Sequence, residues 1–270
     1  MNYVIVDGIL VTEDQPVLKV NNRGYRYGDG LFETMLAREG KIIFETYHFE
    51  RLFEGLQLVQ IELSPEINSK QLASKIRTLC EKNNCNEFAR VRLSVNRGNG
   101  NLSDPHRPQY LIECHPINKR SWNESGLLVD VYPLARKTCD SFSHLKSANY
   151  LPYVMAARYA AQNQLDDALV LNIHERVAES SIANVFMVKD GQLFTPPLRE
   201  GCVAGTVRRW ILENYDVKEK GLTLEDMLSA DEVFLSNAIS GIRWVRQCGK
   251  AKYQAKRSLE IYEKLQQQSS

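Results

Sequence analysis

Apolar and polar residues along the chain follow two periods, one typical of strands and one typical of helices. The segment ARVRLSVN at residues 89–96 has an apolar residue at every second position, which predicts a half-buried strand. Asp7-Gly8 and Asp190-Gly191 each separate two apolar runs, and such dipeptides are a strong hairpin signal. Both halves of the chain are therefore expected to contain antiparallel hairpins.

Helices are predicted where apolar residues recur three or four positions apart. The segment YHFERLFEGLQLV shows this spacing, and a later helix near 151–163 has Pro152 in its first turn, where proline is favoured. The other predicted helices lie near 68–83 and 205–215, and the other predicted strands lie near 110–114, 127–134, 167–172, 232–236 and 242–247.

Strands and helices are mixed in both halves, which predicts an α+β protein of two domains. We expect a small N-terminal domain over residues 1–118 and a larger C-terminal domain over residues 127–270. The segment between them, residues 119–126, is polar and without periodicity, so it is the predicted linker.

The composition narrows the classes of function. The chain has 270 residues and a formal net charge of +1, which gives no reason to expect nucleic acid or a charged membrane as a partner. No apolar run approaches the roughly 20 residues of a membrane-spanning helix, and the start, MNYVIVDGILVTEDQ, is typical of a hairpin rather than a signal peptide. The six cysteines lack metal-binding spacing, so we expect reduced thiols, no metal site and a cytoplasmic location.

A single lysine, Lys146, stands just before an alanine-rich helix in HLKSANYLPYVMA. A lysine becomes a nucleophile toward a carbonyl group when burial or a nearby cation favours its neutral form. Lys146 follows a strand and a loop, so the base of its side chain is expected in a domain interior. Taken alone, however, a lysine at such a position is far more often an ordinary solvated residue.

Other candidate residues lie in loops. Glu179 in VAESSIANVF precedes an apolar strand, where it is either an ordinary loop glutamate or a carboxylate held against a protonated heterocyclic nitrogen. Three glycines in RGYRYGDGLFET permit positive φ angles and close approach of the backbone. A second glycine-rich segment, SVNRGNGN, carries Arg97, which faces either a carboxylate or solvent.

Five motifs, in this order, resemble those of the fold-type IV enzymes that use pyridoxal 5′-phosphate (PLP). They are RGYRYGDGLFE, HFERL, LKSANY, VAESSIANVF followed by DG and TPP, and GCVAGTVRRWIL, spread over about residues 1–250. That family includes branched-chain aminotransferases, D-amino-acid aminotransferases and aminodeoxychorismate lyases. The resemblance implies a C-terminal domain with a mixed, barrel-like β-sheet and a homodimeric assembly.

The resemblance implies a role for each matched residue. Lys146 is expected to hold PLP as a Schiff base and to move the proton at the substrate α-carbon. Glu179 is expected to pair with the pyridinium nitrogen. Arg51 in HFERL is expected to bind the phosphate through its planar guanidinium, and its alternative is an ordinary arginine on a helix surface.

Further phosphate contacts are implied at the start of a helix and in a late turn. In VAGTVRR, the segment Gly205, Thr206 and Val207 is expected to bind phosphate through backbone N–H groups, although Val207 stands where the family usually has threonine. The turn LSNAIS is expected to add backbone N–H donors from Asn237 and Ala238.

The remaining implied contacts concern the cofactor ring and the substrate. Tyr150 matches a tyrosine that bonds the ring oxygen of PLP in branched-chain aminotransferases, although this chain is one residue shorter between lysine and tyrosine. Packing at a helix cap is the alternative for Tyr150. Phe32 and Arg97 are expected to contact the substrate.

The motifs leave the reaction open. The compact chain, the loop SVNRGNGN and the strand LDDALVLN resemble aminodeoxychorismate lyase, which releases pyruvate and 4-aminobenzoate. Tyr150 resembles the branched-chain aminotransferases, and RGYRYGDG resembles the D-amino-acid enzyme. We favour the lyase and keep the two aminotransferases as the alternative. A non-catalytic protein that binds a phosphorylated metabolite is a minor third alternative.

Overall fold

The computed structural model describes residues 2–85, 87–105, 107–118 and 121–268. Its contacts divide the chain into two compact units, the first of Met1–Lys119 with Lys146–Asn149, the second of Arg120–Leu145 with Tyr150–Ser270. The linker expected over residues 119–126 begins with two residues that lie outside the described part of the chain.

The segment Lys146–Asn149 lies in the first unit, whereas the sequence places it within the C-terminal domain. Backbone pairing explains the difference. Ser147 forms an isolated β-bridge with Leu31, and the N–H of Phe32 donates to the carbonyl of Lys146 at 2.9 Å. Lys146 is thus attached to a strand that lies more than a hundred residues earlier in the chain.

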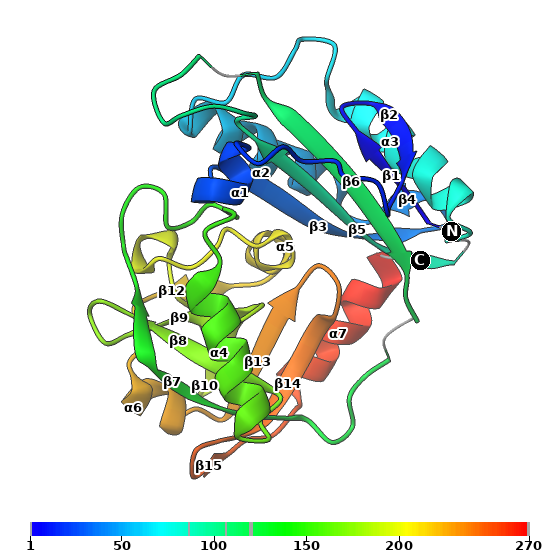
Figure 1. Ribbon diagram of the computed structural model, residues 1–270. Helices are drawn as coiled ribbons and strands as arrows, with labels where there is room; N and C mark the ends of the chain where they lie inside the picture. Colours follow the sequence, from blue (N-terminus) through cyan, green and yellow to red (C-terminus); the bar gives the residue numbers. More distant parts are fainter. Residues whose placement is uncertain (1, 86, 106, 119–120, 269–270) are drawn as a thin grey trace. The chain divides into compact units, whose positions relative to one another are not determined.

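The first unit is a six-stranded antiparallel sheet in the order β2-β1-β6-β5-β3-β4, with two long helices packed against it (Figure 1). Its strands are β1 Tyr3–Val6, β2 Ile9–Thr12, β3 Gly30–Arg38, β4 Lys41–Ile42, β5 Phe88–Asn96 and β6 Gln109–Pro116, and its helices are α1 Arg23–Tyr27, α2 Glu45–Leu58 and α3 Ser69–Lys82.

Local sequence signals account for much of this unit. Strand β5 alternates strictly between buried and half-buried residues, as predicted, and it pairs with β6, which covers the strand predicted near 110–114. The turn between β1 and β2 has Asp7 at φ 49° and Gly8 at φ 89°, and two successive positive φ angles identify the predicted tight hairpin turn. The buried faces of α2 and α3 follow the helical period, with buried Phe49, Leu52, Leu56, Leu72, Ile76 and Leu79.

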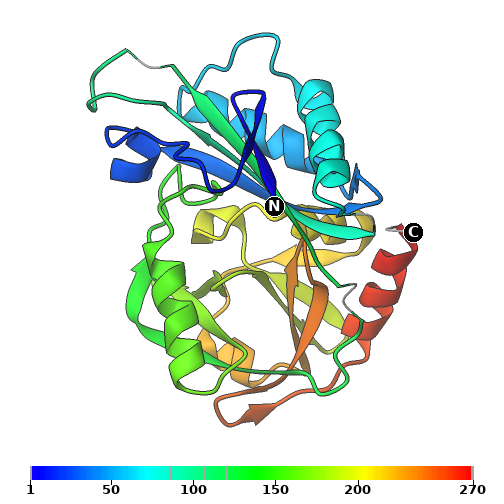
Figure 2. The same ribbon diagram turned by 45° about the vertical axis from the view of Figure 1, so that its right-hand side comes forward.

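The second unit is a nine-stranded mixed sheet in the order β12-β11-β10-β13-β14-β7-β8-β9, with β15 beside β14. The strands curl into a half-barrel (Figure 2). Its strands are β7 Leu127–Lys137, β8 Asp167–Asn172, β9 Val177–Ser180, β10 Asn184–Lys189, β11 Gln192–Thr195, β12 Val217–Glu219, β13 Glu232–Asn237, β14 Gly241–Cys248 and β15 Ala251–Lys252; its helices are α4 Leu151–Gln162, η1 Leu198–Glu200, α5 Thr206–Asn214, α6 Leu224–Leu228 and α7 Arg257–Gln268.

Small residues let a helix approach this sheet closely. Ala156 and Ala160 of α4 are buried with Tyr132 of β7 and with Ala168 and Val170 of β8. A larger apolar cluster fills the half-barrel and includes Val129, Leu169, Val185, Val233, Leu235 and Val245. The α+β class with a curled, mixed C-terminal sheet is therefore confirmed.

The helices of the described residues do not suit a membrane. None of them combines the length and the apolar composition that crossing a bilayer requires.

Candidate active site

Lys146 lies beside an aromatic ring in the first unit. Its Nζ is 4.7 Å from the ring centroid of Phe32, and the Arg92 guanidinium is 3.7 Å from the centroid of the same ring. Phe32 is buried, whereas Lys146 and Arg92 are half-buried. The amine is thus not a fully solvated surface group, and a second cation lies over the same ring.

Arg51 is held by a buried carboxylate on the neighbouring strand. Its Nε donates to Glu33 Oε1 at 2.8 Å and its Nη2 to Oε2 at 2.5 Å, which is a two-pronged ion pair. His48 Nδ1 lies 2.6 Å from Glu33 Oε2. These contacts fix the plane of the Arg51 guanidinium.

Burial and neighbouring charges act in opposite directions on the pKa of the Glu33 carboxyl group. Burial favours the neutral acid, but the charges of Arg51 and His48 outweigh it and lower the pKa of Glu33 to about 2. Burial lowers the pKa of His48, against the opposing effect of Glu33. Glu33 is therefore an anion at neutral pH.

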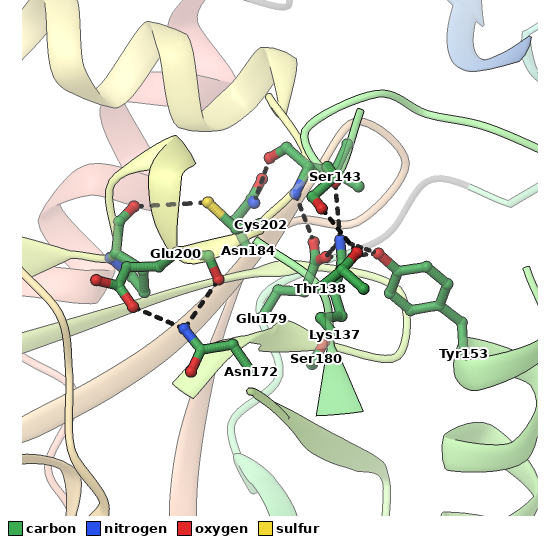
Figure 3. Close-up of polar contacts among 12 residues, drawn as sticks. Lys137, Thr138, Ser143, Tyr153, Asn172, Glu179, Ser180, Asn184, Glu200 and Cys202 are labelled. Atoms are coloured by element: carbon green, nitrogen blue, oxygen red, sulfur yellow. Dashed lines mark hydrogen bonds and ion pairs between the residues drawn. The ribbon is translucent and has the colours of Figure 1, made fainter. Parts of the chain in front are cut away.

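Glu179 lies at the centre of a buried hydrogen-bond network in the second unit (Figure 3). Its Oε1 accepts from Lys137 Nζ at 2.6 Å and from Tyr153 Oη at 2.6 Å. Its Oε2 accepts from the backbone N–H of Val203 at 3.0 Å. We call Glu179, Lys137 and Tyr153 the Glu179 cluster.

Lys137 uses all three of its N–H donors within this unit. Besides Glu179, the ammonium donates to Tyr153 Oη at 2.5 Å and to the Ser143 carbonyl at 3.0 Å. Sequence reasoning missed both Lys137 and Tyr153. Two features of the sequence could have indicated them. Lys137 ends the apolar strand segment YPLARK, and Tyr153 lies on the same helix face as Ala156 and Ala160.

The start of α5 is tied to the same network. A Cβ at Gly205 would lie 1.9 Å from Asn184 Oδ1, so only glycine fits this position. Asn184 Nδ2 donates to the Val203 carbonyl at 2.8 Å. Thr206 and Val207 begin the helix and are buried, and the first backbone N–H groups of a helix have no partner within it.

The other predicted cofactor residues also lie in the second unit. Asn237 ends β13, and its Oδ1 accepts from the backbone N–H groups of Ile239 and Ser240 at 3.0 and 2.7 Å, which shapes the turn that contains Ala238. Tyr150 caps the start of α4, and its ring centroid lies 4.4 Å from that of Tyr153.

The guanidinium of Arg97 is hydrogen-bonded within the first unit. Its Nε donates to both oxygens of Asp29 at 3.1 and 3.0 Å, and its Nη atoms donate to the carbonyls of Gln60 and Val59 at 2.8 and 2.7 Å. These contacts hold the guanidinium of Arg97 in place, and its role toward the substrate stays a prediction. The nearby Gly30 is also structural, because a Cβ there would lie 2.4 Å from the Val95 carbonyl.

The described part of the chain has neither a metal-binding cluster nor a disulfide. No group of acidic, histidine and cysteine side chains there has the arrangement of a metal site. All six cysteines are free thiols.

Comparison with known proteins identifies the family. The sequence model of the class IV amino-transferase family matches residues 30–248. The chain belongs to this family. It is 28% identical over 249 residues to a D-alanine aminotransferase of Staphylococcus haemolyticus, with 88% of this chain and 86% of that protein covered. It is 29% identical over 239 residues to an aminodeoxychorismate lyase of Vibrio harveyi, with 84% and 86% covered.

Solved structures show the same fold. The 4-amino-4-deoxychorismate lyase of Pseudomonas aeruginosa is 28% identical and superposes with a TM-score of 0.84 over 98% of both chains. The branched-chain aminotransferase of Thermoproteus uzoniensis is 23% identical, with a TM-score of 0.89 over 98% of this chain and 94% of the other. Class IV aminotransferases and their lyase relatives depend on PLP, so this protein is a PLP-dependent enzyme.

The residues of each unit fit this cofactor. PLP presents an aldehyde, a phosphate and a pyridine nitrogen, which call for an amine, a cation with N–H donors, and a carboxylate. The first unit supplies the Lys146 amine and an oriented Arg51. The second supplies the helix start at Gly205 and the buried Glu179.

We expect the Glu33 ion pair to make stability depend on pH at the acidic end. Because the pKa of Glu33 falls from 4.5 to about 2 on folding, its stabilisation is fully present above about pH 4.5 and is lost as the pH falls toward 2. A shift of this size corresponds to about 3 kcal/mol.

Denaturant unfolding between pH 7 and pH 2 measures this effect. The Glu33→Gln variant should be less stable than the parent at pH 7 and should lose less stability on acidification. Glu260→Gln, which removes an exposed pair with Arg257, is the control and should follow the parent. Parallel pH curves for Glu33→Gln and the parent would contradict the ion-pair assignment.

Proposed function

We propose that this enzyme is a 4-amino-4-deoxychorismate lyase, which releases pyruvate and 4-aminobenzoate. The observation that carries the proposal is the Arg92 guanidinium over the Phe32 ring that Lys146 also faces. The substrate carries two carboxylates, and a fixed cation near the reacting amine suits a carboxylate remote from the reaction centre. The relatives named as lyases support the same activity.

In this proposal, two side chains and two stretches of backbone hold PLP. Lys146 attaches the cofactor through its Nζ, and Arg51, oriented by Glu33, binds the phosphate. The N–H groups of Thr206 and Val207 and those of the turn at Asn237 and Ala238 add donors for the phosphate. The Gly205 N–H donates to the Val203 carbonyl at 2.8 Å and holds the turn before them. Thr206 also offers a hydroxyl to the phosphate, whereas Val207 offers only its backbone N–H.

The ring contacts come from the second unit. Glu179 pairs with the pyridine nitrogen, and Tyr150 hydrogen-bonds the ring oxygen. When bound, PLP supplies an electron-withdrawing ring that accepts the electrons left when a proton departs from the carbon bearing the substrate amino group.

Lys146 is the proposed acid and base. With PLP bound and its amine freed, Lys146 Nζ would accept the proton from the amine-bearing carbon of the substrate. Loss of the enolpyruvyl group from the neighbouring carbon then makes the ring aromatic, and the departing group takes up a proton to leave as pyruvate. No second substrate and no keto acid enters this reaction.

A D-amino-acid or branched-chain aminotransferase is the second candidate. D-alanine aminotransferases of Staphylococcus haemolyticus and Listeria innocua are 28% and 30% identical to this chain, close to the identity of the lyases. The family membership favours either enzyme over the non-catalytic binder. A homodimer and a cytoplasmic location complete the proposal, supported by the prevalence of two-fold homo-oligomers and by the free thiols.

The attachment point gives a direct test. Borohydride reduction of the yellow, PLP-loaded protein should fix the cofactor to Lys146, as peptide mass spectrometry would show. Lys146→Ala should remove the covalent attachment, whereas Lys189→Ala, which removes a partly exposed ion-paired lysine, should retain it. Labelling of Lys137 or of another lysine would refute the assignment.

The reaction itself separates the two candidates. Aminodeoxychorismate alone should give equal amounts of pyruvate and 4-aminobenzoate, while leucine, D-alanine or glutamate should leave the visible band of the bound cofactor unchanged. Loss of that band with release of the donor's keto acid would instead establish an aminotransferase.

Arg92 provides a further check on the substrate. Arg92→Met should raise KM for aminodeoxychorismate by about tenfold, or about 1.4 kcal/mol, because a carboxylate contact is lost. Arg90 lies two residues away on the same strand face and is also half-buried, so Arg90→Met is the matched control and should change KM little. Equal effects of the two substitutions would count against the carboxylate role.

A further inference from the structure

Lys137 is a buried cation to which the proposed function gives no role. It is 9% exposed and Glu179 is 3% exposed. Lysine is almost never buried without a partner, because removing an ammonium ion from water is costly. The side chain therefore needs an explanation beyond the packing of β7.

The contacts of Glu179 leave one acceptor position for a ligand. An ionised carboxylate has about four acceptor positions, two on each oxygen. Lys137 and Tyr153 fill Oε1, and the Val203 N–H takes one position on Oε2. Among the described residues, these three donors leave Oε2 with one acceptor position for a further donor.

The titratable groups beside Glu179 differ in charge. Burial raises the pKa of Tyr153 well above its usual value, so the phenol stays neutral and its O–H donates a hydrogen bond to Glu179. Burial also raises the pKa of the nearby Cys202 thiol to about 12. Lys137 is thus the group of the Glu179 cluster that balances the charge of the carboxylate.

The three donors to Glu179 come from three separate elements of the second unit. Lys137 ends β7, Tyr153 lies in the first turn of α4, and Val203 lies in the loop before α5. Their donors approach the same carboxyl group, which restricts both its position and its rotation. An acceptor fixed in this way is arranged to receive an N–H in one direction.

We propose that Lys137 is a positioning residue, which holds Glu179 as an oriented anion with one Oε2 acceptor position directed to the pyridine nitrogen of PLP. This inference deepens the proposed function and rests on the cofactor role given there to Glu179. The two lysines then have different roles. Lys146 attaches the cofactor, whereas Lys137 does not, because its ammonium group donates all three N–H groups to protein acceptors.

The inference predicts that removing Lys137 acts through Glu179. Without the ammonium, the proton between Glu179 and the ring nitrogen would move to the carboxylate, since a buried ion pair that has lost a neighbouring charge and a hydrogen-bond donor is less stable than its neutral form. A neutral Glu179 then resembles the amide of Glu179→Gln. Lys137→Gln keeps a donor without the charge, and Lys137→Arg keeps the charge.

Nitrogen NMR of the protein loaded with PLP labelled with ¹⁵N in its ring reads the protonation of that nitrogen directly. The parent and Lys137→Arg should show the protonated nitrogen, whereas Lys137→Gln, Lys137→Met and Glu179→Gln should shift the signal toward the unprotonated form. Lys189→Met, which removes an ion-paired lysine elsewhere in the same unit, should match the parent.

Turnover adds a second measurement. We expect kcat of Lys137→Gln to fall by about the same factor as that of Glu179→Gln, and the double variant to be no slower than either, since both changes neutralise one carboxylate. Lys137→Arg should restore most of the turnover.

The outcomes separate two failures. If Glu179→Gln leaves the ¹⁵N signal of the parent, the cofactor role of Glu179 is wrong, and the inference falls with it. If Glu179→Gln shifts the signal but Lys137→Gln does not, only the role of Lys137 is overturned. Should Lys137→Met fail to fold, the contrast between Lys137→Gln and Lys137→Arg gives the same decision.

Discussion

The buried carboxylate of Glu179 constrains the second unit more than any other single group. An uncompensated charge in a protein interior costs several kcal/mol, so a carboxylate at 3% exposure needs both a cation and hydrogen-bond donors. Lys137, Tyr153 and Val203 provide them from a strand end, a helix and a loop. The termination of β7, the first turn of α4 and the approach to α5 are therefore all fixed around one carboxyl group.

The first unit also contains a buried ion pair, but its carboxylate and cation have exchanged roles. There the buried carboxylate of Glu33 is the support, and the cation of Arg51 is the group that it orients. A guanidinium held by two oxygens in one plane loses little freedom when it binds a phosphate. In both units, a buried ion pair thus supports the residue that we assign to the cofactor.

Much of this arrangement follows from local sequence signals. Strict alternation specified β5, and Asp-Gly pairs specified two hairpins, since positive φ angles at Asp7 and Gly8 are available at low cost to these residue types. The resemblance of motifs also indicated the PLP-dependent family, which the family comparison confirms. The roles of Lys146 and Glu179 stay predictions.

Tertiary pairing decided what the sequence could not show. Lys137 was not singled out, because nothing near residue 137 in the sequence reveals a carboxylate 42 positions later. The bridge between Ser147 and Leu31 was equally invisible, although it places Lys146 in the first unit. The contacts of Arg97 with Asp29 and with two loop carbonyls were also not visible in the sequence, and its role toward the substrate stays a prediction.

A crystal structure of the PLP-bound protein tests the central claim most directly. The account predicts electron density that is continuous between Lys146 Nζ and the cofactor, Glu179 Oε2 within hydrogen-bond distance of the ring nitrogen, and Lys137 still bonded to Oε1. Density that joins the cofactor to Lys137, or a ring nitrogen that faces a group other than Glu179, would contradict it.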